Sequence, residues 1–278
     1  MKLSIITVNL NNRDGLKRTI DSVVSQTFTD YEWIVIDGGS TDGSRELIEQ
    51  YSDHFAYWCS EPDKGIYNAM NKGIAHAKGE WLQFLNSGDW FTSNNVLEIV
   101  FYTPIEADII FGNVFLTNGN ELTPIKYSSD LSFSTLYYQS LPHPSSFINH
   151  SLFSLKLYNE DYVIVSDWAF FLECALKKCV FAHIDVFVCY FDSTGISSNN
   201  RKMVLEEREK VIDKYVPKCI QIDIEELDKK NTAFADGQLS EINELRHKNR
   251  FFHRIVTLNL WFLRFLDNII YHIKNKEF

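Results

Sequence analysis

The chain has 278 residues, 45% of them hydrophobic, which is enough to bury a sizeable core and fits one catalytic domain with an appendage. Its net charge of −10 argues against a nucleic-acid partner, because phosphate binding requires a basic surface. Five scattered cysteines without a C-x-x-C pair support neither a disulfide framework nor a zinc site.

Strand-like and helix-like patterns alternate over about the first 90 residues. An apolar, β-branched run at 3–8 predicts a buried strand, and apolar residues on one face predict a helix over 15–26. Further strands are expected at 32–37, 54–59 and 80–85, and further helices at 44–51 and 67–77. This alternation predicts an α/β fold with a parallel sheet, whose ligand site lies at the carboxyl ends of the strands.

The pattern is looser after Trp90, where we expect shorter strands around 107–116 and 181–191 and a helix over 168–177. A shift in charge marks a domain boundary between Ile222 and Gln238, and residues 238–273 read as one or two helices.

Asp37 stands where the second expected strand ends, next to two glycines that let the backbone approach a ligand closely. A carboxylate at this place can accept hydrogen bonds from a base N–H or from ribose hydroxyls. It can equally serve as a turn or cap residue, and the local pattern leaves both roles open.

The segment Asn86-Ser87-Gly88-Asp89 ends the expected strand at 80–85 in a similar way. Asp89 can bind Mg²⁺ or Mn²⁺, cations that keep open positions for diphosphate oxygens. It can also cap a helix, because Thr92-Ser93-Asn94 and an apolar run follow.

A polar loop over residues 60–73 leads into the helix at 67–77. Helix N-termini and lysines suit phosphate binding, although an ordinary solvated loop explains these residues as well. Asp167 begins a later helix, and capping alone would explain its presence.

Read together, these segments resemble family 2 glycosyltransferases of the GT-A fold. The similarity rests on four ordered motifs, at Ser4–Thr7 with Asn11, at 36–43, at 61–67 and at 79–89. It continues more weakly at His143-Pro144, 165–168 and 195–198. It implies a Rossmann-like, mostly parallel central sheet flanked by helices, with a C-terminal helical extension.

The implied domain organisation is a catalytic domain over residues 1–222 and a helical, basic tail over 223–278. Residues 1–100 would form the nucleotide-sugar half of the catalytic domain, and 101–222 the acceptor half.

The resemblance also implies roles for single residues. Asp89 matches the aspartate that binds Mn²⁺ or Mg²⁺, and Asp167 matches the catalytic base. Donor-binding roles fall on Thr7, Asn9, Asn11, Asp37, Asp63, Lys64 and Asn71.

The chain departs from the family pattern at four positions. The family usually has aspartate where Gly38 stands, carboxylates where Asn86 and Gly88 stand, and often arginine where Met70 stands. The expected metal site therefore carries fewer charges than is usual.

The expected reaction is a single in-line displacement with inversion, in which Asp167 accepts the proton of the acceptor hydroxyl. The donor would be a nucleoside diphosphate sugar, and a UDP-sugar is the expected one. The transferred group would be a hexosyl or an N-acetylhexosaminyl group. The acceptor would be a glycan or lipid-linked glycan. Two alternatives remain: an inactive homologue acting as a binding or assembly subunit, and a sugar-phosphate nucleotidyltransferase.

The tail is basic, since seven Lys or Arg against two carboxylates after residue 245 give it a charge of +5 and leave −15 for the rest. Its apolar residues recur every three or four positions over 251–273, as in an amphipathic helix. Contact with a membrane surface, docking on the catalytic domain and a homo-oligomer interface are all compatible with this pattern. The cysteines and the absence of a signal-peptide pattern favour a cytoplasmic location, with the inner membrane face as an option.

Overall fold

The computed structural model describes residues 1–119, 121–154, 156–195, 200–227 and 229. Its contacts divide the chain into two compact units, Met1–Tyr215 and Val216–Phe278. In the second unit, residues 218–227 are helical. The predicted boundary after residue 222 stays a prediction, and the helices expected over 238–273 lie outside the described residues.

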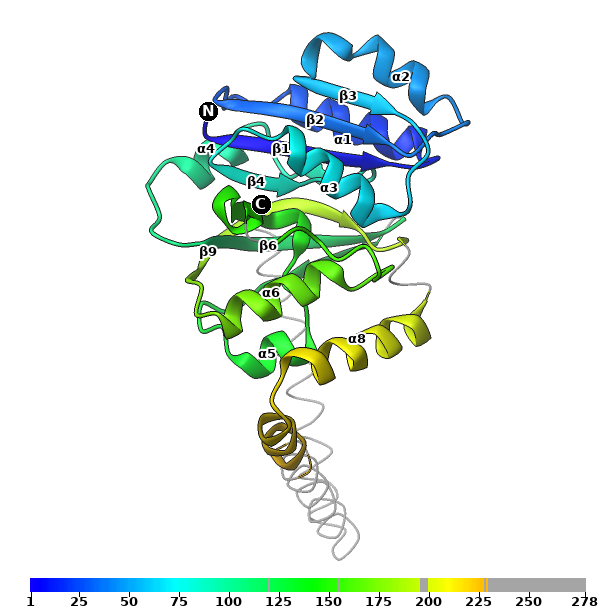
Figure 1. Cartoon of the computed structure of the whole chain (residues 1–278). Helices are drawn as coiled ribbons and strands as arrows, with labels where there is room; N and C mark the ends of the chain where they lie inside the picture. Colours follow the sequence, from blue (N-terminus) through cyan, green and yellow to red (C-terminus); the bar gives the residue numbers. More distant parts are fainter. Residues whose placement is uncertain (120, 155, 196–199, 228, 230–278) are drawn as a thin grey trace, which may run out of the picture. The chain divides into compact units, whose positions relative to one another are not determined.

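A nine-stranded sheet forms the centre of the first unit, with the strand order β3-β2-β1-β4-β8-β6-β9-β5 and with β7 paired to β6 (Figure 1). The strands are β1 (Leu3–Asn9), β2 (Tyr31–Asp37), β3 (Tyr57–Ser60), β4 (Trp81–Phe84), β5 (Trp90–Phe91), β6 (Ile109–Asn118), β7 (Glu121–Ile125), β8 (Ser146–Asn149) and β9 (Phe181–Asp192).

The first four strands run parallel, as predicted, with β1 between β2 and β4. Strand β8 is antiparallel to both β4 and β6 and so joins the two halves of the sheet. Strand β9 returns parallel to β6, and the two-residue strand β5 pairs antiparallel with the end of β9. The last pairing brings the end of β9 next to the turn that follows β4.

Helices flank the sheet on both faces. They are α1 (Arg13–Val24), α2 (Ser44–Gln50), α3 (Ile66–His76), α4 (Val96–Phe101), α5 (Phe133–Tyr138), α6 (Ser166–Leu176) and α8 (Arg201–Tyr215), with single 3₁₀ turns at Ser52–His54, His143–Ser145 and His150–Ser154. The expected α/β architecture is therefore confirmed.

Helix α1 shows how local sequence produces this arrangement. The side chain of Asn12 caps it by accepting a hydrogen bond from the Gly15 backbone, which is why it begins two residues before the predicted start. Its buried residues Leu16 and Ile20 pack with strand residues such as Trp33 in the main hydrophobic core.

Helix α3 packs closely against β1 and β2 at a glycine. A Cβ atom on Gly73 would lie 2.5 Å from Cγ2 of the buried Ile6, closer than such atoms approach. Glycine at this position therefore sets how near the helix lies to the sheet.

We expect Gly73→Ala to lower the free energy of unfolding by about 1–3 kcal/mol, because the added methyl group overpacks this contact. Helix propensity alone would make the alanine variant more stable by about 1 kcal/mol, so a loss of stability would indicate overpacking. Urea unfolding measures it. Ile6→Ala should cost less in the Gly73→Ala background than in the wild type; a more stable Gly73→Ala variant would contradict the close-packing argument.

Candidate active site

A cavity of about 450 Å³ opens where β1 and β4 end. It is lined by the end of β1, the start of α3, the turn 86–89, the loop 160–164, the start of α6 and residues 191–195. This is the carboxyl edge of the parallel strands, where the alternating sequence pattern predicts a ligand site.

The charges around the cavity are unbalanced. Of the described residues that line it, only Lys64 carries a basic side chain of the Lys or Arg type. Five lining residues are carboxylates: Asp63, Asp89, Glu160, Asp167 and Asp192. A diphosphate in such a cavity meets a repulsive field unless a cation accompanies it.

Asp37 is fully buried beside the cavity rather than lining it. Its carboxylate accepts hydrogen bonds from Asn9 Nδ2 (2.7 Å), from Ser40 Oγ (2.6 Å) and from Ser60 Oγ (2.6 Å). Burial acts to raise the pKa of Asp37, but these bonds outweigh it and hold that pKa below its usual value.

Asn9 lines the cavity directly and is 4% exposed. Its Nδ2 donates to Asp37, whereas its buried Oδ1 has no hydrogen-bond partner in the described part of the chain. Asp37 thus orients an amide whose acceptor oxygen is available to an N–H group of a ligand.

Thr7 and Asn11 do not line the cavity. Thr7 is buried, donates from Oγ1 to the Leu85 carbonyl (2.8 Å) and accepts from Trp33 Nε1 (3.0 Å), so it ties β1 to the end of β4. Asn11 accepts from the Thr41 backbone (2.9 Å) and links the loops that follow β1 and β2. Their donor-binding roles remain predictions.

Asp63 and Lys64 lie in the loop before α3 and line the cavity. Asp63 Oδ1 accepts from the Gly65 backbone (2.8 Å). A Cβ on Gly38 would lie 2.6 Å from Asp63 Oδ2, so this carboxylate occupies space beside the position where the family usually has aspartate.

Asn71 lies behind the cavity wall. Its side chain pairs with the backbone of Tyr158 and donates to Glu160 (2.9 Å), which anchors the loop that carries Glu160. Hydrogen bonds from Asn71 and then Asn68 lower the pKa of Glu160, against the effect of its burial.

Asp89 is 3% exposed and lies in the turn between β4 and β5. Its Oδ1 accepts from the Asp192 backbone N–H (2.9 Å), and burial raises the pKa of Asp89 to about 8 despite that bond. The helix cap considered for Asp89 is not seen, because β5 follows it and Asn95 stands at the start of α4.

The residues near Asp89 suit a hard divalent cation. Asn86 Oδ1 is buried and unpartnered among the described residues, and the surroundings disfavour a lone negative charge on Asp89. No group of three or more His, Cys, Asp or Glu side chains within the described ranges is arranged to hold a metal. A Mg²⁺-type ion nevertheless usually has only one or two carboxylate ligands from the protein when phosphate oxygens of the substrate complete its coordination shell.

Asp167 lies in the first turn of α6, on the cavity wall. Its Oδ1 accepts from the Tyr67 hydroxyl (2.8 Å), and its Oδ2 is 4.0 Å from Nδ1 of the buried His143. Burial lowers the pKa of His143, although Asp167 opposes the shift, so the imidazole is not a permanent counter-ion.

Two neighbours of Asp167 are not predicted as site residues by the sequence pattern. Tyr67 and His143 stand in segments that carry the resemblance, but neither segment predicts contact with a residue so far along the chain. Their positions indicate that they orient the Asp167 carboxylate.

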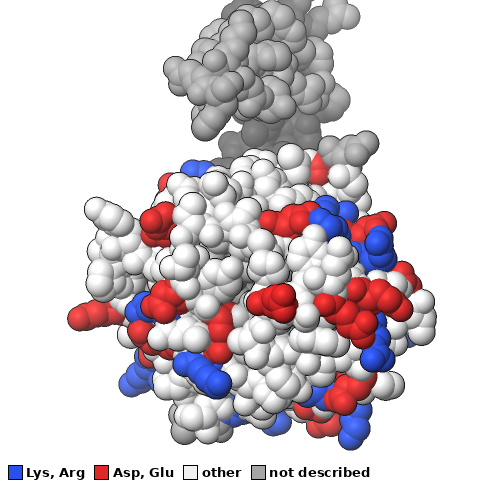
Figure 2. Space-filling view, turned by 90° about the horizontal axis from the view of Figure 1, so that it is seen from above, with Lys and Arg blue, Asp and Glu red and all other residues white. Residues whose placement is uncertain are grey.

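On the face drawn in Figure 2, Lys and Arg side chains are interspersed with Asp and Glu and are not gathered into one basic surface. The expected lack of a nucleic-acid partner remains a prediction. None of the helices in the described ranges has the length and apolar character that a membrane span requires.

The solved structures that share this fold include GT-A glycosyltransferases. Residues 1–349 of Staphylococcus aureus TarS in complex with UDP-GlcNAc align with a TM-score of 0.59 at 19% identity, over 70% of this chain and 59% of that fragment. A Pyrobaculum calidifontis mannosyltransferase in complex with GDP-Man and Mn²⁺ aligns with a TM-score of 0.56 at 14% identity, over 72% and 59% of the two chains. At these identities the likeness establishes the fold.

Sequence comparison narrows the class. The profile described as "Glycosyl transferase family 2" matches residues 4–172. An uncharacterized glycosyltransferase of Mycobacterium tuberculosis is 38% identical over 205 residues, 71% of this chain and 77% of the relative. A "PGL/p-HBAD biosynthesis glycosyltransferase" of Mycobacterium bovis is 29% identical over 204 residues, 70% and 78% of the two chains. The chain belongs to glycosyltransferase family 2.

Proposed function

We propose that this glycosyltransferase moves a sugar from a nucleoside diphosphate donor, with inversion, to a hydroxyl of a glycan or lipid-linked glycan. The observation that carries the proposal is the pair of Asp89 and Asp167 on the wall of one cavity. One carboxylate lies among oxygen ligands suited to a metal, and the other accepts a hydrogen bond from the Tyr67 hydroxyl.

In this mechanism Asp167 takes the proton of the acceptor hydroxyl as that oxygen attacks the anomeric carbon. Tyr67 holds the carboxylate in place by donating to Oδ1. A Mn²⁺ or Mg²⁺ ion held by Asp89 would neutralise the charge that develops on the diphosphate. The cavity has no arginine among its described lining residues to do this instead.

Uridine is the proposed base. The free acceptor Asn9 Oδ1 suits an N–H of the base, and TarS, a structural neighbour, was solved with UDP-GlcNAc. The Mycobacterium bovis relative is named for PGL/p-HBAD biosynthesis, and a lipid-linked acceptor is part of the present proposal. Whether the transferred sugar is a hexose or an N-acetylhexosamine is part of the test.

The direct experiment is a panel of UDP-, GDP- and dTDP-sugars scored for Mn²⁺-dependent release of the nucleoside diphosphate, with the product anomer assigned by NMR. Turnover that stops in EDTA and an inverted anomer support the proposal. Retention of the donor configuration, or UDP binding without turnover of any donor and acceptor, would point respectively to another mechanism and to an inactive binding subunit.

We expect Asn9→Ala to weaken UDP binding about tenfold, because one hydrogen bond to the base is lost, worth about 1.4 kcal/mol. Ser60→Ala is the matched control, since Ser60 also donates to the Asp37 carboxylate, at Oδ2, but does not line the cavity. Calorimetry in Mn²⁺ compares them. Equal losses in the two variants would mean that only the support of Asp37 matters.

The location and the tail remain proposals. We propose a cytoplasmic enzyme whose 251–273 segment, outside the described residues, lies on the inner face of the membrane. Sedimentation with anionic vesicles, comparing the full chain with a variant ending at Gln238, tests this, and equal sedimentation contradicts it. Size-exclusion chromatography of the same two proteins tests the alternative that the tail joins two copies.

A further inference from the structure

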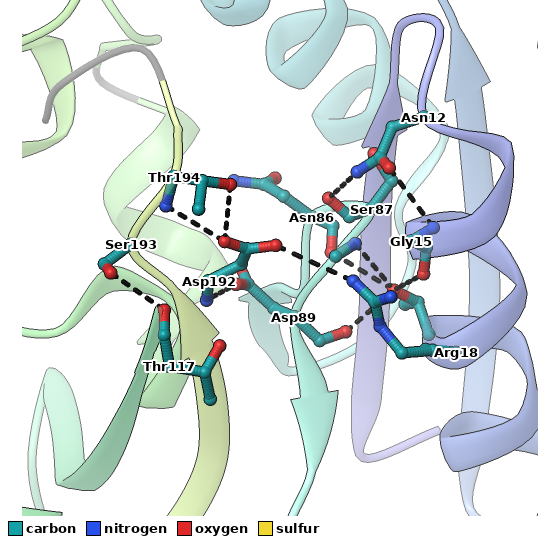
Figure 3. A network of polar contacts seen from close by, with 12 residues as sticks. Asn12, Gly15, Arg18, Asn86, Ser87, Asp89, Thr117, Asp192, Ser193 and Thr194 are labelled. Atoms are coloured by element: carbon teal, nitrogen blue, oxygen red, sulfur yellow. Dashed lines mark hydrogen bonds and ion pairs between the residues drawn. The ribbon is translucent and has the colours of Figure 1, made fainter. Parts of the chain in front are cut away.

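The end of strand β9 is held against the turn that contains Asp89. The backbone N–H of Asp192 donates to Asp89 Oδ1 at 2.9 Å, although the two residues are 103 positions apart. The pairing of β5 with β9, from Trp90 with Tyr190 to Phe91 with Cys189, supports the same approach. Asp192 also lines the cavity, so its carboxylate reaches the space beside Asp89 (Figure 3).

Gly88 lies beside this carboxylate. Its φ of 107° is a backbone conformation that favours glycine. A Cβ built there would lie 3.4 Å from Asp192 Oδ2 and 3.6 Å from Asp192 Cβ. The carboxylate of Asp192 is therefore next to the position where a side chain of residue 88 would begin.

The two oxygens of Asp192 have different surroundings. Oδ1 accepts from the backbone N–H (2.9 Å) and from Oγ1 (2.7 Å) of Thr194, which orients the carboxylate. Oδ2 is 3.7 Å from an Arg18 nitrogen, which is an ion pair but too long for a hydrogen bond. Figure 3 shows Asp192 between Thr194 and Arg18, with Asp89 and Asn86 beside it.

Besides the carboxylates of Asp89 and Asp192, an amide oxygen is available in the Asn86–Asp89 turn. Asn86 Oδ1 is buried and without a hydrogen-bond partner among the described residues, and Asn86 lines the cavity. Hard cations bind to oxygen donors of this kind, namely carboxylates and amide carbonyls, with phosphate oxygens completing the shell.

We propose that Asp192 is the second carboxylate ligand of the divalent cation at Asp89, supplied from the end of β9 beside Gly88. The inference rests on the proposed metal-dependent function and assigns a cation-binding residue outside the Asn86–Asp89 turn. The pair then carries two negative charges toward the ion, and Arg18 balances Asp192 when the ion is absent.

The competing explanation is that Asp192 only shapes the turn through its bonds to Thr194. Asp192→Asn separates the two, because an asparagine Oδ1 can accept both Thr194 bonds while the charge is removed. The control is Asp185→Asn on the same strand, whose carboxylate bonds to Asn113 (2.8 Å) and does not line the cavity.

The experiment titrates Mn²⁺ into the full chain with saturating UDP and follows the free ion by EPR. We expect Asp192→Asn to weaken Mn²⁺ binding about 10–100-fold and Asp185→Asn to leave it unchanged. Thermal unfolding without Mn²⁺ checks that both variants are folded. If Mn²⁺ affinity falls in Asp89→Asn but not in Asp192→Asn, the inference about Asp192 is overturned, whereas the proposed metal dependence is not. A wild type that binds UDP equally tightly with and without Mn²⁺ overturns the proposed metal dependence and this inference with it.

Discussion

Asp167→Asn is expected to lower kcat by about 10²–10⁴-fold, the usual contribution of a general base, while the Kd for UDP in Mn²⁺ stays the same. The substitution keeps the size of the side chain and lets Oδ1 accept from the Tyr67 hydroxyl, so the geometry of the cavity wall is retained. What is lost is the ability to take a proton. Initial rates and calorimetry on the same preparation measure the two quantities.

Asp161→Asn serves as the control, because Asp161 is an exposed carboxylate in the preceding loop and does not line the cavity. It should keep nearly normal activity. A near-normal kcat for Asp167→Asn would assign the base role elsewhere, with Glu160 the nearest candidate on the cavity wall. Tyr67→Phe should give a smaller loss than Asp167→Asn, since it keeps the base and removes a hydroxyl that contacts Asp167 Oδ1 and the Ile164 carbonyl.

The second large effect is expected for Asp89→Asn, which should weaken Mn²⁺ binding and Mn²⁺-dependent UDP binding by more than about 100-fold, beyond the loss typical of outer-shell changes. The asparagine can still accept the Asp192 backbone N–H, so the turn is preserved while the charge is removed. In EDTA the two proteins should bind UDP equally well, because the difference depends on the cation.

Asp108→Asn provides the comparison for Asp89→Asn. Asp108 also accepts a backbone N–H, from Val180 at 2.7 Å, but it does not line the cavity. It should leave Mn²⁺ binding unchanged. If Asp89→Asn binds Mn²⁺ and UDP like the wild type, Asp89 does not hold the metal.

The sequence pattern predicts the first four strands and three helices of the first unit within a few residues. The reason is physical: buried parallel strands read as continuous apolar runs, and the helices between them carry a regular apolar face. Boundaries differ where a single side chain decides them, as Asn12 does for α1.

The second half of the sheet is less predictable. Strand β8 has four residues and β5 has two, and such lengths carry no measurable periodicity. The antiparallel position of β8 between β4 and β6 follows from tertiary packing, which no local pattern encodes.

The candidate site divides in the same way. The positions of Asp37, Asp89 and Lys64 near the site can be predicted, because the sequence pattern shows where the strands end and where a helix begins. The contacts of Asp167 with Tyr67 and of Asp89 with Asp192 join segments about a hundred residues apart and become visible only in the fold.

These distant contacts have a consequence for synthesis of the protein. At about 5–20 residues per second, roughly 5–20 s pass between the emergence of one partner and that of the other. Strand β8 begins about 60 residues after β4 ends, so for roughly 3–12 s of synthesis β4, whose four residues are all buried in the finished sheet, lacks its neighbour β8 and has an open apolar edge. We expect chaperones to crosslink to nascent chains in which β8 is still inside the ribosome. Crosslinking should be much weaker in longer nascent chains, in which β8 has emerged and can pair with β4. Equal crosslinking at both lengths would indicate that the edge of β4 is protected by other means.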